Sequence, residues 1–191
     1  MTEEQEPPSA PSLAISAIVF YALMSLLGIA LLDSSTVSTR QLVFGDGQSL
    51  VGDTLLGAGS GILVVGLTWL VRNQRAVKRL NADFRTMLGT PPTGVIAVLA
   101  LTSAIGEELL FRGALQEILG FVPTVLLFGF VHGGLSRKYR AWAFFATLAG
   151  VLLGWLALAT GNLLAPILCH MTVNYFNLHL VCAQSEVKEP N

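Results

Sequence analysis

Long apolar runs, separated by short polar stretches, make up most of the chain. Six of these runs are predicted to be membrane segments, and they cover residues 13–32, 54–71, 94–119, 122–135, 141–160 and 163–183. An α-helix rises about 1.5 Å per residue and the hydrocarbon core of a bilayer is about 30 Å thick, so about 20 apolar residues cross it. The pattern therefore predicts an all-α protein, a polytopic membrane bundle of about six helical segments.

The fourth run, residues 122–135, is too short to cross a bilayer alone, because its helix reaches only about two-thirds of the way. Gly120 and Pro123 mark a break where this run begins. Bends and short helices at membrane depth are tolerated only where protein or enclosed water surrounds them. We therefore expect one short or bent segment around a wet or enclosed centre.

The polar stretches predict the orientation of the chain. Residues 72–85 carry five basic side chains and one acid, and residues 137–140 carry three more basic side chains. By the positive-inside rule both stretches are expected to be cytoplasmic loops, which places both termini in the cytoplasm. Residues 1–12 contain three glutamates and no Lys or Arg, so they do not have the basic start of a secretory signal.

These boundaries divide the chain into four expected parts. They are a disordered tail over residues 1–12, two helices with a basic loop over 13–93, a membrane core over 94–183 and a C-terminal tail over 184–191. Asp53 is expected to be the N-cap of the second helix. Gly57 and Gly61 form a GxxxG pattern, which predicts close packing against another helix.

Composition supports a membrane protein and argues against a nucleic-acid-binding protein. The chain has 53% hydrophobic and 12% charged residues, with a mean hydropathy of +0.66, whereas soluble domains have about 25% charged residues. The net charge is −1 and the basic residues form no long stripe, so a nucleic-acid partner is not expected. Cys169 and Cys182 lie in one predicted helix, too far apart for a disulfide.

Candidate chemistry comes from charges inside the apolar runs. Glu107, Glu108 and Arg112 interrupt the third run, where an ionisable group costs at least a few kcal/mol and is a functional-site hypothesis by default. Glu108 and Arg112 are four residues apart with the acid first, the favourable order for an ion pair on a helix. Glu107 points about 100° away on the same helix and has no local cation.

Two later apolar runs each contain a histidine that lies four residues from another candidate side chain. Phe128 precedes His132 by four residues, and His170 precedes Asn174 by four. Each feature alone is explained by packing or by an interhelical hydrogen bond worth about 1 kcal/mol. Polar groups on several segments, including an unpaired carboxylate, favour a shared functional site instead.

A carboxylate, two histidines and an asparagine suit hydrolysis of an amide by activated water. A glutamate withdrawn from water can act as a general base near neutral pH, and together with one histidine it can hold and deprotonate a water. The other histidine and the asparagine can donate hydrogen bonds to the oxyanion. No serine or cysteine has a triad-like setting, because Cys169 and His170 are neighbours that point about 100° apart.

A metal site is the alternative use of the same groups. Glu107, His132 and His170 together form a donor set that leaves open positions for water on a metal such as zinc. The chain contains no HExxH motif, the usual signature of zinc peptidases. His179, near the end of the last run, is expected to reach towards the membrane interface.

Three ordered motifs carry a family resemblance. They are EELLFR at residues 107–112, FGFVH at 128–132 and HMTVN at 170–174. The chain thereby resembles the CAAX prenyl protease and bacteriocin-processing (CPBP, or Abi) family of intramembrane proteases, whose motifs are EExxxR, FxxxH and HxxxN. The resemblance implies that residues 94–183 form the catalytic core of an integral membrane endopeptidase.

The resemblance also assigns expected roles. Glu107 and His132 would activate water, and His170 and Asn174 would form the oxyanion site. Glu108 and Arg112 would support them, as would the motif residue Phe128. Family members have been described both as metal-independent and as metalloproteases, so the expectation is no cofactor, with zinc as the alternative.

The expected partners are a peptide or lipidated protein substrate and membrane lipid. The expected location is a prokaryotic plasma membrane or an organellar membrane. Two other functions stay open: a non-catalytic scaffold or immunity protein that binds a peptide in the same cavity, and a carrier of protons or metal ions. A carrier would be favoured by acids in further segments, and residues 13–32, 54–71 and 141–160 contain none.

Overall fold

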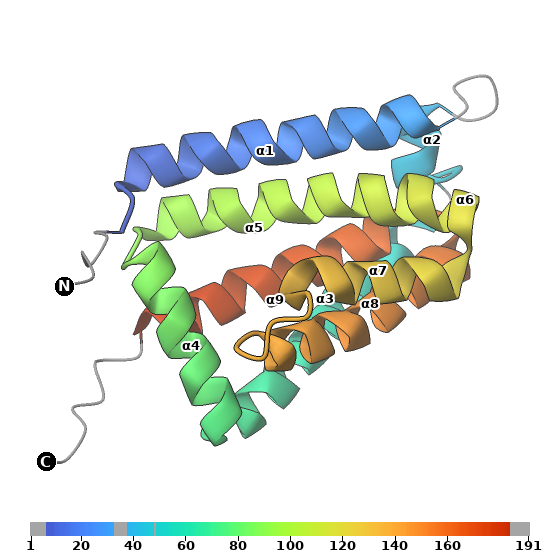
Figure 1. Ribbon diagram of the computed structural model, residues 1–191. Coiled ribbons are helices and arrows are strands. Elements are labelled where there is room, and N and C mark those ends of the chain that lie inside the picture. Colours follow the sequence, from blue (N-terminus) through green and yellow to red (C-terminus); the bar gives the residue numbers. More distant parts are fainter. Residues whose placement is uncertain (1–6, 33–37, 48, 184–191) are drawn as a thin grey trace, which may run out of the picture.

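The computed structural model describes residues 7–32, 38–47 and 49–183, and every regular element within them is helical (Figure 1). In chain order the elements are α1 (Ala10–Leu31), α2 (Thr39–Phe44), α3 (Leu50–Val71), α4 (Arg75–Leu88), α5 (Thr93–Glu108), a π-helix (Leu109–Leu115), α6 (Gln116–Leu119), α7 (Phe121–Gly133), α8 (Arg140–Thr160) and α9 (Leu164–Ala183). Each of the six predicted segments corresponds to a helix, and the predicted all-α membrane bundle is confirmed.

Four helical stretches among the described residues are long and apolar enough to cross a bilayer: α1, α3, residues 93–119 and α8. The helix α7 has only 13 residues, as its short apolar run predicts. Large apolar side chains such as Leu23, Leu55 and Leu63 on α1 and α3 are more than 60% exposed. Exposed apolar faces of this extent are what contact with lipid requires.

The helices pack in long side-by-side pairs, α1 with α5, α3 with α9 and α7 with α8 (Figure 1). Glycines lie where two backbones meet. A Cβ atom at Gly61 would lie 2.9 Å from the Cys169 carbonyl oxygen, and one at Gly57 would overlap Ala165. The GxxxG prediction of close helix packing is therefore confirmed, with α9 as the partner of α3.

The third predicted segment is long and changes helix type along its length. It runs from α5 through the π-helix into α6, and the chain turns at Gly120, where φ is 84°. A π-helical turn within a helix is rare and is frequently found at functional sites. Here it begins directly after the two glutamates and contains Arg112.

Two of the polar stretches between the apolar runs contain helices. The helix α2 lies within the stretch that follows α1, and α4 covers most of the basic stretch 72–85. The loop prediction for residues 72–85 is wrong, because Leu80, Phe84 and Leu88 recur at helical spacing and give α4 an apolar side. Phe84 packs edge-to-face on Trp142 of α8, with ring centroids 4.7 Å apart.

Two predicted boundaries also change. The helix α1 begins at Ala10, because Ser9 caps it by accepting a hydrogen bond from Ser12 N, so the predicted tail of residues 1–12 is wrong at its end. Asp53 is not an N-cap: it lies in the first turn of α3, buried, and accepts a 2.7 Å hydrogen bond from Asn162. The tail residues 1–6 and 184–191 lie outside the described residues.

Candidate active site

Three helices bring one carboxylate and two histidines together. The Glu107 Oε2 atom, at the end of α5, lies 3.5 Å from His132 Nε2 of α7 and 3.9 Å from His170 Nε2 of α9. Oε2 is buried and has no hydrogen-bond partner among the described residues. These three predicted site residues therefore meet around one oxygen atom whose hydrogen-bonding capacity is unused.

The second glutamate is engaged by its neighbours. Glu108 is completely buried, and its Oε1 atom accepts hydrogen bonds from Arg112 Nη1 at 2.9 Å and from His170 Nδ1 at 2.7 Å. Arg112 also donates to the Gly150 carbonyl at 3.4 Å. The predicted Glu108–Arg112 pair is present, and the same carboxylate also holds one of the two histidines.

The hydrogen bonds at Nδ1 determine the tautomer of each imidazole ring, that is, which nitrogen carries the proton when the ring is neutral. His132 Nδ1 lies 2.7 Å from the Phe128 carbonyl oxygen, which can only accept, so Nδ1 must carry the proton. His170 Nδ1 faces the Glu108 carboxylate in the same way. When the two rings are neutral, both therefore present a free lone pair on Nε2 towards Glu107.

Phe128 holds the two rings in place. Its ring centroid lies 4.3 Å from that of His132 and 6.2 Å from that of His170, and the Arg112 guanidinium lies 4.2 Å from its centre. The side chain is 2% exposed. This position agrees with the supporting role that the motif implies.

Asn174 lies one helical turn after His170 on α9. Its Nδ2 atom donates a 2.9 Å hydrogen bond to Ser103 Oγ, and Ser103 is one turn before Glu107 on α5. Asn174 thus lies beside the cluster and is hydrogen-bonded to α5, the helix that carries Glu107. Its described hydrogen bond goes to Ser103 and not to either histidine.

Two neighbours of the cluster, Tyr21 and Ser103, were not predicted as site residues. A Cβ atom at Gly106 would lie 2.8 Å from the Tyr21 carbonyl oxygen, so α1 approaches α5 directly beside the glutamates. The Tyr21 hydroxyl interacts with the Glu107 carboxylate. The available signals were weak: a tyrosine inside the first apolar run, and a serine four residues before Glu107.

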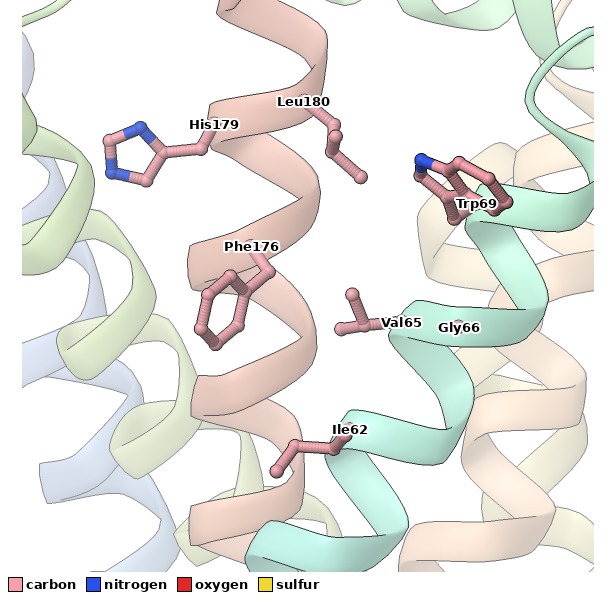
Figure 2. Close-up of a pocket in the computed structure, with 7 residues that line it drawn as sticks. All are labelled: Ile62, Val65, Gly66, Trp69, Phe176, His179 and Leu180. Atoms are coloured by element: carbon pink, nitrogen blue, oxygen red, sulfur yellow. The ribbon is translucent and has the colours of Figure 1, made fainter.

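Two hollows of the structure lie away from the cluster. Figure 2 shows a groove between α3 and α9, lined by Ile62, Val65, Gly66, Trp69, Phe176, His179 and Leu180. Its volume is about 490 Å³. A second hollow of about 800 Å³ is lined mainly by residues of 41–49, 113–118 and 160–162. Neither includes Glu107, His132 or His170, so the site is identified by its buried polar groups and not by a pocket.

The donor set of the cluster suits a metal ion in chemical type. A carboxylate and two imidazole Nε2 atoms, each held from its Nδ1 side, match the ligands and outer hydrogen bonds that zinc sites use. As the side chains stand, no three His, Cys, Asp or Glu residues among those described form a preformed metal site. The carboxylate and the two imidazoles are donors of the type that binds zinc, but these side chains would have to move closer together to bind the ion.

The fold and the cluster together define a polytopic helical membrane protein with a buried carboxylate–histidine site. Residues 89–176 match the family model described as type II CAAX prenyl endopeptidase Rce1-like. The match contains all three motifs and confirms the resemblance to the CAAX prenyl proteases, a family of membrane peptidases. The bacteriocin-processing part of the expected family name stays a prediction.

A relative in Bacillus subtilis (strain 168), described as uncharacterized protein YpbD, is 35% identical over 81 residues. The alignment covers 41% of this chain and 41% of the relative, so it spans less than half of either protein. No solved structure matches the chain.

Proposed function

We propose that the protein is an intramembrane endopeptidase in which Glu107 and His132 activate a water molecule. The observation that carries the proposal is the placement of Glu107 Oε2 within 3.5 and 3.9 Å of two Nε2 atoms, while both Nδ1 atoms are already hydrogen-bonded. A water at this point can donate one hydrogen bond to the carboxylate and one to an imidazole.

The proposed reaction uses these positions. The water oxygen attacks the carbonyl carbon of the scissile peptide bond while its proton passes to the Glu107 carboxylate. The oxyanion that forms receives a hydrogen bond from an N–H of Asn174. Glu107 then gives its proton to the leaving nitrogen, the C–N bond breaks, and the products are a new carboxyl group and a new amine. General acid–base catalysis of this kind contributes typically 10²–10⁴-fold in rate.

In this proposal His170 differs from its expected role. Its Nδ1–H is directed at Glu108, so the neutral ring can accept a hydrogen bond from the water at Nε2 but cannot donate one to the oxyanion. We therefore assign the oxyanion contact to Asn174 and the orientation of the water to both histidines.

The proposed substrate is a peptide or lipidated protein, of the CAAX type that the family description names. In this type the modified cysteine precedes the residues that are removed. The protein would act in a prokaryotic plasma membrane or an organellar membrane, with both termini in the cytoplasm, an orientation supported by the basic residues of α4 and of 137–140.

A zinc-dependent version of the same hydrolysis uses the same residues. Glu107, His132 and His170 would hold the ion, which would supply a Lewis acid and lower the pKa of a bound water. The contacts of Glu108 to His170 and of Phe128 to His132 would then orient the ligands.

The test is cleavage of quenched-fluorescent peptides that end in a farnesylated CAAX sequence, by the purified full-length protein in detergent. We compare wild type, Glu107→Gln and the matched control Glu117→Gln, an exposed glutamate on α6, each with and without a chelator. We expect Glu107→Gln to lower the rate at least 100-fold, and Glu117→Gln to leave it unchanged.

The chelator distinguishes the metal-independent mechanism from the zinc-dependent one. Activity that survives the chelator supports water activated by the glutamate and histidine alone, and activity lost on chelation supports zinc. If the wild type cuts none of the peptides while a photo-crosslinking peptide still labels it, a non-catalytic scaffold replaces the enzyme as the better explanation.

A further inference from the structure

The Asn174 amide is held by a residue outside the three motifs. The Ser103 hydroxyl accepts the 2.9 Å hydrogen bond from Asn174 Nδ2, and Ser103 is only 5% exposed. Ser103 also lies on the helix that carries Glu107, one turn earlier. The bond therefore fixes an asparagine of α9 relative to the carboxylate of α5.

The direction of this bond is set by a second one. The single proton of the Ser103 hydroxyl is donated to the Ala100 carbonyl at 3.2 Å, so the oxygen can offer only lone pairs to Asn174. The amide nitrogen of Asn174 must then face Ser103, and its oxygen must face elsewhere. One N–H is used in the bond, and the other stays available as a donor.

We propose that Ser103 is a positioning residue, which orients the Asn174 amide so that its second N–H donates to the oxyanion. This inference rests on the proposed function for its kinetic consequence. A flipped amide would present its carbonyl oxygen to the oxyanion, and two like partial charges would repel each other.

A second asparagine on α9 supplies a matched control. The Thr68 hydroxyl of α3 lies 2.9 Å from the Asn177 amide oxygen, to which it donates, so this bond runs in the opposite direction to the bond from Asn174 to Ser103. Thr68 also lies 2.9 Å from the Val65 carbonyl oxygen three residues earlier in its own helix, a position that matches the Ser103–Ala100 contact. Both pairs join α9 to a neighbouring helix, but only Asn174 belongs to the candidate site. If the two pairs only hold helices together, removing either hydroxyl has the same kind of effect.

The kinetic experiment uses the full-length protein and the farnesylated peptide. Ser103→Ala is expected to lower kcat about tenfold, the lower end of what loss of an outer hydrogen-bond partner costs a site, with KM within twofold of wild type. Ser103→Thr keeps the hydroxyl and is expected to retain kcat, and Thr68→Ala is expected to leave kcat unchanged. In an Asn174→Ala background, Ser103→Ala is expected to have no further effect.

A second measurement does not depend on turnover. In ¹⁵N-labelled protein, the side-chain NH₂ signals of Asn174 are expected to shift in Ser103→Ala and to stay in place in Thr68→Ala. Unchanged Asn174 signals in Ser103→Ala overturn the positioning bond, whether or not the wild type cleaves the peptide. Equal losses of kcat in Ser103→Ala and Thr68→Ala overturn it too, because they indicate helix packing alone. Failure of the wild type to cleave, with shifted Asn174 signals, counts against the proposed function and not against the bond.

Discussion

Replacing Arg112 with methionine removes the cation from the buried pair and leaves the Glu108 carboxylate with His170 alone. The side chains of Arg112 and Glu108 are 1% and 0% exposed, and their closest N–O distance is 2.9 Å. Water cannot reach the carboxylate to replace the lost partner. Arg112→Met should therefore be far more destabilising than loss of an exposed ion pair.

The magnitude follows from this burial. Removing one partner of a buried pair typically costs about 3–5 kcal/mol, because an uncompensated charge is left behind. That is a large share of a total stability of about 5–15 kcal/mol. Neutralising both partners, as in Glu108→Gln with Arg112→Met, removes the stranded charge, so the double variant is expected to be more stable than Arg112→Met alone. The control is Lys138→Met, which breaks an exposed 3.0 Å pair with Asp83 and should cause no measurable change.

The assay is reversible unfolding in mixed micelles, followed by circular dichroism, for the wild type and the variants. It needs no substrate, so its result stands apart from the proposed peptidase activity. If Arg112→Met loses no more stability than Lys138→Met, the pair is not the buried, unhydrated contact described above. If the double variant is less stable than Arg112→Met, stranded charge is not the reason for the loss.

Two further predictions test the packing and the neighbourhood of Glu107. Gly61→Ala should destabilise the protein by about 1–3 kcal/mol, because its new methyl group would meet the α9 backbone, whereas Gly66→Ala on the same helix meets nothing within 4 Å and should be neutral or stabilising in the same unfolding assay. Tyr21→Phe should lower kcat about fivefold, the rate equivalent of one hydrogen bond worth about 1 kcal/mol, and equal losses in the control Tyr175→Phe would exclude a specific role for Tyr21.

The helices could be predicted from the sequence because their signal is local. The length of an apolar run is visible directly in the sequence and predicts the length of the helix. Gly57 and Gly61 predict a close helix–helix contact but do not indicate which helix is the partner. The sequence predicts a loop where α4 lies, because its charges are typical of a loop, although its apolar residues recur at helical spacing. Charge density indicates the side of the membrane, but periodicity determines whether the segment is helical.

Only part of the site could be predicted, because its members meet across helices. The motif spacing predicts the pair of Glu108 and Arg112, which is observed, and leaves Glu107 without a cation on its own helix. It could not show that His170 contacts both carboxylates, one at each ring nitrogen. That arrangement depends on the approach of α9 to α5, and the same approach brings Asn174 to Ser103. Neither the contacts of His170 with the two carboxylates nor the contact of Asn174 with Ser103 can be predicted from a local sequence pattern.

The order of the residues in EELLFR explains why two adjacent glutamates are present. A carboxylate paired with a buried cation is a poor base, because the cation stabilises its ionised form. An unpaired buried carboxylate is a better base but is costly to bury. The four-residue spacing pairs Arg112 with Glu108, and Glu108 in turn fixes His170, so the charge that stabilises the fold also orients the ring beside Glu107. Glu107 Oε2 has no hydrogen-bond partner among the described residues, and in the proposed reaction it accepts a hydrogen bond from the attacking water. Exchanging the two glutamates' partners, by moving the arginine one residue earlier, would pair Glu107 instead and remove the proposed base while keeping the composition of the segment.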